Sequence, residues 1–142
     1  MEWRYFDSQQ DQNAAERLWH EAGWLNRPDP QACKGMAAFT AASKGYAGLV
    51  HGAPECFVFI IEAKLRYLND DLSLCGVAGV ATSRNGRKHG LALGLTARAV
   101  AEAGRDGVAV AGLSTFEQGF YNRIGFGNAA YEHLWRFDPV RL

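Results

Sequence analysis

The chain has 142 residues, the usual size of a single domain. Hydrophobic residues make up 48% of it and charged residues 21%, a balance that excludes wholesale disorder and fibrous architectures. Fifteen Lys and Arg balance fifteen Asp and Glu, so an anion site has to be local rather than part of an overall basic field. We therefore expect one compact domain, with neither nucleic acid nor a membrane as its partner.

The three cysteines, Cys33, Cys56 and Cys75, are far apart in the chain and have no Cys-x-x-Cys spacing. We expect reduced thiols, with no disulfide framework and no zinc or other metal site. The N-terminus does not resemble an export signal, and the longest apolar run, Cys56 to Ile61, is too short to span a membrane. These features predict a cytoplasmic location.

Hydrophobic spacing in the first half of the chain predicts one strand, two helices and then a three-stranded antiparallel meander. Gly23 and Gly45 are expected to end the helices, and Asn69 to Asp71 are typical of a hairpin turn. The expected elements are a strand at 3–6, helices at 11–22 and 31–44, and strands at 46–51, 55–68 and 72–82.

The second half predicts a change to alternating strands and helices. A polar loop at 83–90 leads into a helix at 91–105, and an apolar strand at 108–113 then lies parallel to the strand before the loop. Ser114 and Thr115 begin two overlapping capping-box patterns, which predict a short helix up to Arg123 and then a closing strand or hairpin at 126–137. The expected class is α/β, with a mixed, mostly antiparallel sheet and about four helices in the order β-α-α-β-β-β-α-β-α-β.

Positive charge is concentrated in the loop before the third predicted helix, which contains Arg84, Arg87, Lys88 and His89. The N–H groups of a first helical turn have no intrahelical partners, and the helix dipole adds positive charge there, so a phosphate or diphosphate suits this position. Gly90 would let the backbone approach such a ligand closely. By spacing alone, a solvated turn that keeps the sheet edge soluble is an equal alternative.

The same segment carries a family resemblance. The chain reads Gly79-Val80-Ala81-Thr82 and then, in the form R-x-x-G-x-A, Arg87-Lys88-His89-Gly90-Leu91-Ala92. These two runs resemble the acetyl-CoA-binding signature of the GNAT superfamily of N-acetyltransferases. Residues 120–127, in which Tyr121 precedes a Gly-Phe pair, resemble its second signature. Residues 113–127 are most similar to the enhanced-intracellular-survival-type (Eis-like) branch. Ser114 departs from the Asn that many members of the superfamily carry, and Phe116 departs from the Ser that is common in this branch.

The resemblance implies that acetyl-CoA is the cosubstrate and that its acetyl group passes to an amine of a small molecule or a protein. We expect direct transfer rather than a covalent intermediate on Cys75, because no His partner lies at a recognisable spacing from this cysteine. The resemblance also implies that the backbone of Val80, Ala81 and Thr82 binds the pantetheine arm and that residues 87–92 wrap the diphosphate. It further implies that Tyr121 protonates the departing thiolate, since a phenol is neutral at pH 7 and can donate its proton. The alternative for Tyr121 is a core tyrosine with its hydroxyl at the surface.

The general base and the acceptor are not evident from the sequence. Glu62 and His51 are candidate bases, but a charged strand edge and a turn residue explain them equally well. Some Eis-like proteins use the terminal carboxylate as base, which we do not expect here because Leu142 follows soon after the last predicted strand. Aromatic residues in the regions that usually line the acceptor cleft suit an apolar amine or belong to the core. They are Trp19, Trp24, Phe39, Tyr46, Tyr131 and Trp135.

Two alternatives to an enzyme of this family remain. A non-catalytic acyl-CoA-binding or regulatory module would keep the diphosphate loop without turnover, although the presence of Tyr121 argues against it. A nucleotide-binding α/β protein of another fold would place a glycine-rich loop directly after its first strand, and here the loop follows several other elements. A homodimer is compatible with the aromatic edge of the small sheet.

Overall fold

The computed structural model describes residues 1–25, 29–117, 119–129, 136, 138 and 140. Its strands form one sheet in the order β1-β2-β3-β4-β5, in which β5 is parallel to β4 and the other neighbours are antiparallel. This topology confirms the predicted mixed sheet. The elements are β1 Glu2–Tyr5, α1 Ser8–Glu21, α2 Pro30–Ala41, β2 Lys44–Val50, β3 Ala53–Tyr67, β4 Asp70–Thr82, α3 Leu91–Arg105, β5 Val110–Gly112 and the 3-10 helix η1 Tyr121–Ile124.

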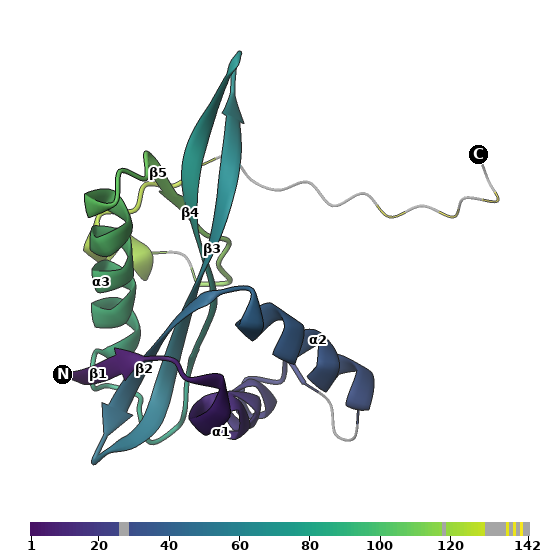
Figure 1. The fold of residues 1–142 in the computed structure, drawn as a ribbon, viewed down its shortest axis with the longest axis vertical. Coiled ribbons are helices and arrows are strands. Elements are labelled where there is room, and N and C mark those ends of the chain that lie inside the picture. Colours follow the sequence, from purple (N-terminus) through teal and green to yellow (C-terminus); the bar gives the residue numbers. More distant parts are fainter. Residues whose placement is uncertain (26–28, 118, 130–135, 137, 139, 141–142) are drawn as a thin grey trace.

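Helices cover both faces of the sheet, with α3 on one face and α1 and α2 on the other (Figure 1). Successive side chains of a strand point to opposite faces, so the apolar run in β3 contributes to two cores. Cys56 and Val58 pack in the cluster under α3, whereas Phe57 and Phe59 pack in the cluster under α1 and α2. Burial on both faces explains why this run is continuously apolar rather than alternating.

Capping aspartates set the starts of the two N-terminal helices. Asp7 accepts a hydrogen bond from the Gln9 N–H at 2.9 Å, so α1 begins three residues earlier than predicted. Asp29 accepts hydrogen bonds from the Gln31 and Ala32 N–H groups, both at 3.0 Å, and α2 begins at the proline that follows it.

The predicted end of the second helix is wrong. Helix α2 stops at Ala41, and Lys44 and Gly45 belong to β2. Gly45 is needed for close packing rather than for termination, because a Cβ there would lie 2.5 Å from Phe6 Cβ and 2.8 Å from Phe59 Cε1.

Two hairpin turns join the central strands. His51 and Gly52 both have positive φ (51° and 77°), as a type I′ turn between β2 and β3 requires. The β3–β4 turn lies at Leu68 and Asn69, one residue earlier than predicted, and Asp70 already pairs with Tyr67. The end of this long hairpin projects beyond the helices (Figure 1).

The C-terminal part differs most from the prediction. No α-helix forms at 114–123 in its described residues, which contain only the short η1. Thr115 Oγ1 instead accepts a hydrogen bond from the N–H of Glu117, two residues further along the chain, at 3.1 Å. The predicted capping residue thus closes a local turn and does not begin a helix. Residues 126–129 have no regular structure, and most of the predicted closing strand lies outside the described residues.

Candidate functional site

Strands β4 and β5 diverge, which leaves part of β4 with an open edge. The two strands pair over three residues, from the pair Leu74–Val110 to the pair Gly76–Gly112. Strand β4 then continues to Thr82 with no partner on that side among the described residues. The predicted pantetheine-binding residues Val80, Ala81 and Thr82 are the last three residues of this open segment. Backbone N–H and C=O groups at such an edge can bond to an extended ligand as though it were another strand.

A β-bulge bends β4 in the same segment. Phe57 pairs with Ala81 and Phe59 pairs with Ala78, so β4 contains one extra residue between these pairs. Gly79 in the bulge has a φ of 58°. A Cβ at Gly79 would lie 3.0 Å from Phe59 Cδ2 and 3.2 Å from Trp19 Cζ2, so both the backbone angle and the packing require glycine here.

Loop 83–90 connects β4 to the N-terminus of α3, as the sequence predicts. Gly90 is the N-cap of α3, with a φ of 70°, and its carbonyl accepts the first helical hydrogen bond from the Gly94 N–H at 3.0 Å. No side chain in the described part of the chain caps this helix, and a Cβ at Gly90 would have nothing within 4 Å. The N–H groups of Leu91 and Ala92, in the first turn, are therefore available to an anion.

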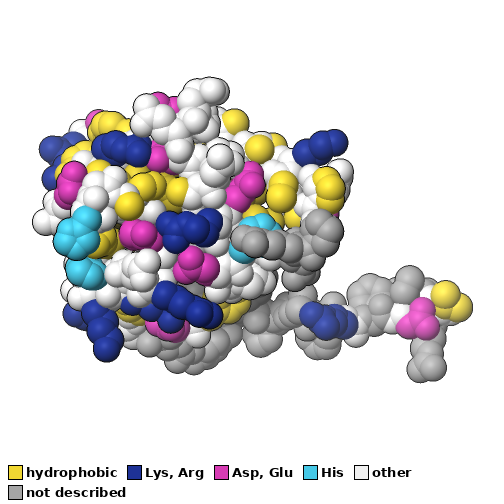
Figure 2. All heavy atoms as spheres, turned by 90° about the horizontal axis from the view of Figure 1, so that it is seen from below, with side chains coloured by type: hydrophobic (Ala, Val, Ile, Leu, Met, Phe, Trp, Pro, Cys, Tyr) yellow, Lys and Arg dark blue, Asp and Glu magenta, His cyan; other side chains and the backbone are white. Residues whose placement is uncertain are grey.

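The basic side chains of this loop are exposed. Arg84, Arg87, Lys88 and His89 all lie at the surface, and Lys88 has a φ of 67°. Figure 2 shows the molecule from below, the end at which β4 leads into α3, and basic and acidic side chains are interspersed there. Attraction of an anion to this end therefore depends on the first-turn N–H groups and the helix dipole, with the loop cations adding to it locally.

Tyr121 is the first residue of η1, which lies near α3 (Figure 1). Its half-buried ring is 4.9 Å from the Phe120 ring and 6.0 Å from the Phe126 ring, measured between centroids. Burial, and then the proximity of Cys56 and Glu117, raise the pKa of Tyr121 above its ordinary 10.0. The phenol is therefore protonated at neutral pH and, among the described residues, its hydroxyl has no hydrogen-bond partner.

Cys56, on β3, is hydrogen-bonded to the last residue of β4 and lies close enough to Tyr121 to affect its pKa. The Thr82 hydroxyl donates to Cys56 Sγ at 3.2 Å, and Cys56 is fully buried. Burial raises the pKa of the Cys56 thiol to about 11, although the hydrogen bond from Thr82 opposes the shift. A neutral thiol is a poor nucleophile, so Cys56 is a packing residue in a site that includes Tyr121 and Thr82.

The two candidate bases are not brought together with Tyr121. His51 is exposed in the β2–β3 turn, and Glu62 is exposed on β3, where it pairs with Cys75 beyond the bulge. His51 therefore precedes the part of β3 that pairs with the bulge of β4, and Glu62 follows it. Burial raises the pKa of the Cys75 thiol, which makes this cysteine equally unsuited to nucleophilic attack.

Only some of the predicted cleft aromatics lie at the bulge. Trp19 and Phe39 pack against Gly79, and Trp24, which is 43% exposed, has its ring centroid 5.5 Å from that of Trp19. Tyr46 is buried in the opposite core under α3, which agrees with the second of the two alternatives for these aromatic residues. Tyr131 and Trp135 lie outside the described residues.

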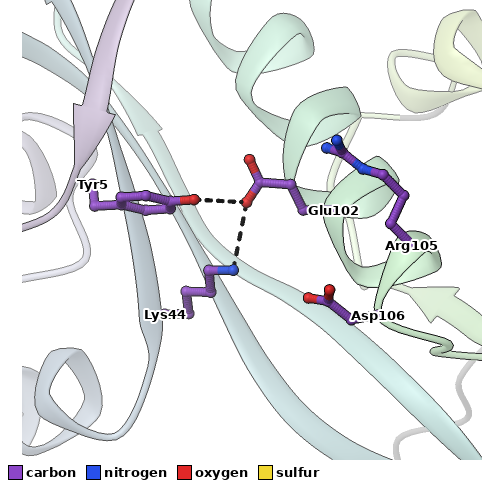
Figure 3. Close-up of a pocket in the computed structure, with 5 residues that line it drawn as sticks. All are labelled: Tyr5, Lys44, Glu102, Arg105 and Asp106. Carbon is purple, nitrogen blue, oxygen red and sulfur yellow. Dashed lines mark hydrogen bonds and ion pairs between the residues drawn. The ribbon is translucent and has the colours of Figure 1, made fainter.

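A surface cavity of about 390 Å³ lies at the other end of α3, and Figure 3 shows its lining residues. Within it, Glu102 accepts hydrogen bonds from the Tyr5 hydroxyl at 3.1 Å and the Tyr46 hydroxyl at 2.8 Å, and its carboxylate is 3.4 Å from Lys44 Nζ. These internal partners satisfy the carboxylate. The cavity is remote from Gly90 along α3, and we interpret its polar group as a structural tie between α3 and the edge of the sheet.

One residue that shapes the site was missed in the sequence. Gly86 is buried within loop 83–90, where a Cβ would lie 2.7 Å from the Glu55 carbonyl oxygen. Its N–H donates to Ser83 Oγ at 2.9 Å. The Asn85-Gly86 pair is a turn signal, so the turn itself could have been predicted, but the close contact with β3 could not.

The part of the chain that the structure describes contains no group of three or more His, Cys, Asp or Glu side chains that could hold a metal ion. None of its helices has the length and apolar character needed to cross a membrane. All three cysteines are free, and Cys56 and Cys75 are buried.

The family's sequence model for the acetyltransferase (GNAT) domain matches residues 58–129, about half of the chain, from within β3 to just past η1. The chain belongs to the GNAT acetyltransferase family. No curated protein matches it. The match includes the open edge of β4, the loop before α3 and Tyr121.

Solved structures share this GNAT fold at low sequence identity. A probable N-acyltransferase from Enterococcus faecalis has a TM-score of 0.76 at 14% identity and matches 87% of this chain and 32% of its own. Eis1 from Mycobacterium abscessus has a TM-score of 0.72 at 17% identity, with 89% of this chain and 32% of its own matched. The chain thus spans about a third of these two proteins. A predicted acetyltransferase from Clostridium acetobutylicum, solved with acetyl-CoA, matches 99% of this chain and 97% of its own, with a TM-score of 0.71 at 15% identity.

Proposed function

We propose that this GNAT domain transfers the acetyl group of acetyl-CoA directly to an amine. The observation that carries the proposal is the open edge of β4, which ends at the loop before the uncapped start of α3. An open strand edge beside an uncapped helix start suits an extended arm that ends in a diphosphate, as in acetyl-CoA, and Tyr121 would supply the proton donor.

The diphosphate would be held at the start of α3. The N–H groups of Leu91 and Ala92 supply donors there, and the exposed Arg87, Lys88 and His89 supply positive charge. The backbone of Val80, Ala81 and Thr82 would bond to the pantetheine arm along the open edge. Acetyl-CoA supplies an activated acyl group as a thioester.

Tyr121 is proposed as the general acid. As the bond between the acetyl carbon and sulfur breaks and the bond to the amine nitrogen forms, the thiolate needs a proton, which the neutral phenol can give. A phenol with the ordinary pKa of 10.0 already holds this proton at neutral pH, and burial raises the pKa of Tyr121 further in the same direction. Because Glu62 and His51 are exposed and on opposite sides of the bulge, we propose that the amine loses its proton to water.

The first test is thermal unfolding with and without acetyl-CoA, in the wild type and in Gly90→Asp. A ligand that binds only the folded state at a hundred times its Kd stabilises by about 2.7 kcal/mol, so a clear rise in Tm is expected. A carboxylate at position 90 would occupy or repel the anion site, and the open space there leaves room for it. We expect Gly90→Asp to remain folded and to lose the rise in Tm.

The second test is release of free CoA thiol across a panel of small amines and amine-bearing peptides. Thiol release that depends on the amine supports transfer. Protection by acetyl-CoA with no thiol release for any amine would instead indicate the non-catalytic acyl-CoA-binding module. The cytoplasmic location and the homodimer remain predictions from the sequence, for which fractionation and the solution mass are the measurements.

A further inference from the structure

Charged side chains of helix α1 link loop 83–90 to the start of β3. Glu21 Oε2 accepts a hydrogen bond from the Arg84 N–H at 3.1 Å. The Arg17 guanidinium donates to Glu21 Oε1 at 3.1 Å, and its other terminal nitrogen donates to Glu55 Oε2 and to the Pro54 carbonyl, each at 3.1 Å. One arginine thus joins α1, the start of β3 and, through Glu21, the loop.

Glu55 also supports the loop through its backbone. Its carbonyl accepts a hydrogen bond from the Ser83 N–H at 2.9 Å, and Gly86 packs directly against the same carbonyl. Glu55 is only 8% exposed, so its carboxylate needs a cationic partner, and Arg17 is that partner. Removing Arg17 would leave this carboxylate uncompensated directly under the loop.

We propose that Arg17 is a positioning residue for the diphosphate-binding loop. By bridging Glu21 and Glu55, it fixes the backbone at Arg84 and Gly86 and thereby the approach to the first turn of α3. This inference rests on the proposed function, because it gives Arg17 a task in ligand binding only if loop 83–90 receives the diphosphate.

Charge gives Arg17 a second effect on the same site. Glu21 and Glu55 lie behind a loop that is proposed to bind an anion, and their carboxylates repel a diphosphate. The Arg17 guanidinium offsets part of that repulsion. Its side chain is 39% exposed, so solvent screens part of the pair, whereas Glu55 is mostly buried and would lose its cationic partner. We therefore expect Arg17→Ala to lower both the stability of the fold and the affinity for a diphosphate.

The experiment compares two ligands that differ in the diphosphate. The dissociation constants of acetyl-CoA and S-acetylpantetheine, which lacks the diphosphate and the nucleotide, are measured by NMR titration for the wild type and for Arg17→Ala. We expect the Kd for acetyl-CoA to rise about tenfold, on the scale of one lost charge-assisted hydrogen bond. The Kd for S-acetylpantetheine should stay within about twofold, because the open edge of β4 does not depend on Arg17.

Further variants separate position from charge. Glu21→Gln keeps an oxygen that can accept from the Arg84 N–H, so it should retain nearly wild-type affinity for acetyl-CoA, whereas Glu21→Ala should weaken it. Arg17→Lys should fall between wild type and Arg17→Ala, since an ammonium group lacks the fork that reaches both carboxylates. The matched control is Arg66→Ala, which removes an exposed pair with Asp71 on the distant hairpin and should change neither Kd.

The results distinguish this inference from the proposed function. If the wild type binds acetyl-CoA and Arg17→Ala binds it equally well, the positioning role is overturned while the proposed function stands. An equal loss for both ligands would also overturn it, since it would show a general structural effect. If the wild type does not bind acetyl-CoA, both proposals fail. Should Arg17→Ala not fold, the Glu21→Ala and Glu21→Gln pair decides in the same way.

Discussion

The bulge in β4 makes a sharp prediction about stability, because two glycines of the site both have a positive φ but differ in their surroundings. Gly79 has a φ of 58° and Gly90 a φ of 70°, so alanine at either position is forced into the left-handed region. That costs about 1–2 kcal/mol for an L-residue. The gain from a less flexible unfolded chain is the same in both variants and cancels in the comparison.

The surroundings decide the difference between the two variants. A Cβ at Gly79 would be 3.0 Å from Phe59 Cδ2 and 3.2 Å from both Phe39 Cε1 and Trp19 Cζ2, whereas at Gly90 it would meet nothing within 4 Å. Overpacking a core typically costs about 1–3 kcal/mol. We therefore expect Gly79→Ala to lower the free energy of unfolding by about 2–5 kcal/mol and Gly90→Ala by only about 1–2 kcal/mol.

Urea unfolding followed by circular dichroism measures both losses, and Tm should fall by about 3 °C per kcal/mol for a chain of this size. Adding Phe39→Leu to Gly79→Ala should recover part of the loss, because it withdraws one of the crowding rings. Equal losses for the two alanine variants, or a larger loss for Gly90→Ala, would refute the claim that packing at the bulge, and not the backbone angle alone, requires glycine.

Three further predictions concern titratable groups. Tyr121→Phe keeps the ring contacts and removes the hydroxyl proton. We therefore expect kcat to fall about a hundredfold with little change in the KM for acetyl-CoA. An unchanged kcat in a thiol-release assay would contradict the general-acid role. Because burial raises the pKa of Tyr121 above 10.0, kcat should be lost through phenol ionisation only above that pH, and a Tyr121-dependent decline below about pH 9 would contradict this. Burial opposes ionisation of Glu102, but hydrogen bonds from Tyr46, Tyr5 and Lys44 lower its pKa below 4.5. The ionised carboxylate therefore stabilises the fold above pH 4.5, and this stabilisation is lost as the pH falls through the lowered pKa. Glu102→Gln should make the urea midpoint less dependent on pH in this acid range, and an unchanged dependence would count against the prediction.

Local patterns were sufficient where the structure depends on neighbours in sequence. The helix at 91–105 was predicted with its observed bounds because its apolar spacing, the glycine before it and the Asp-Gly pair after it all agree. The predicted helix at 114–123 was wrong because capping patterns alone do not provide an apolar face. Thr115 uses its hydroxyl in a two-residue turn instead.

The details that shape the site depend on contacts between distant parts of the chain. Gly79 is an isolated glycine in a strand pattern, which suggests a bulge, but the rings that crowd it come from α1, α2 and β3. Arg17 and Glu55 are 38 residues apart, and no spacing rule relates them. Tyr121 could be identified through its motif, whereas its proximity to Cys56 follows only from the fold.

The two ends of α3 are held in different ways, and the difference suits the proposed function. Near its C-terminal end, Glu102 bonds to Tyr5 and Tyr46 of the sheet. At its N-terminal end, Leu91 and Leu95 pack so closely on Gly48 that a Cβ there would lie 3.3 Å and 3.1 Å from their methyl groups. A capping side chain would add about 1 kcal/mol to the stability of the helix but would occupy the N–H groups that an anion needs. Packing on Gly48 positions the first turn without a cap, so these donors stay both fixed and free.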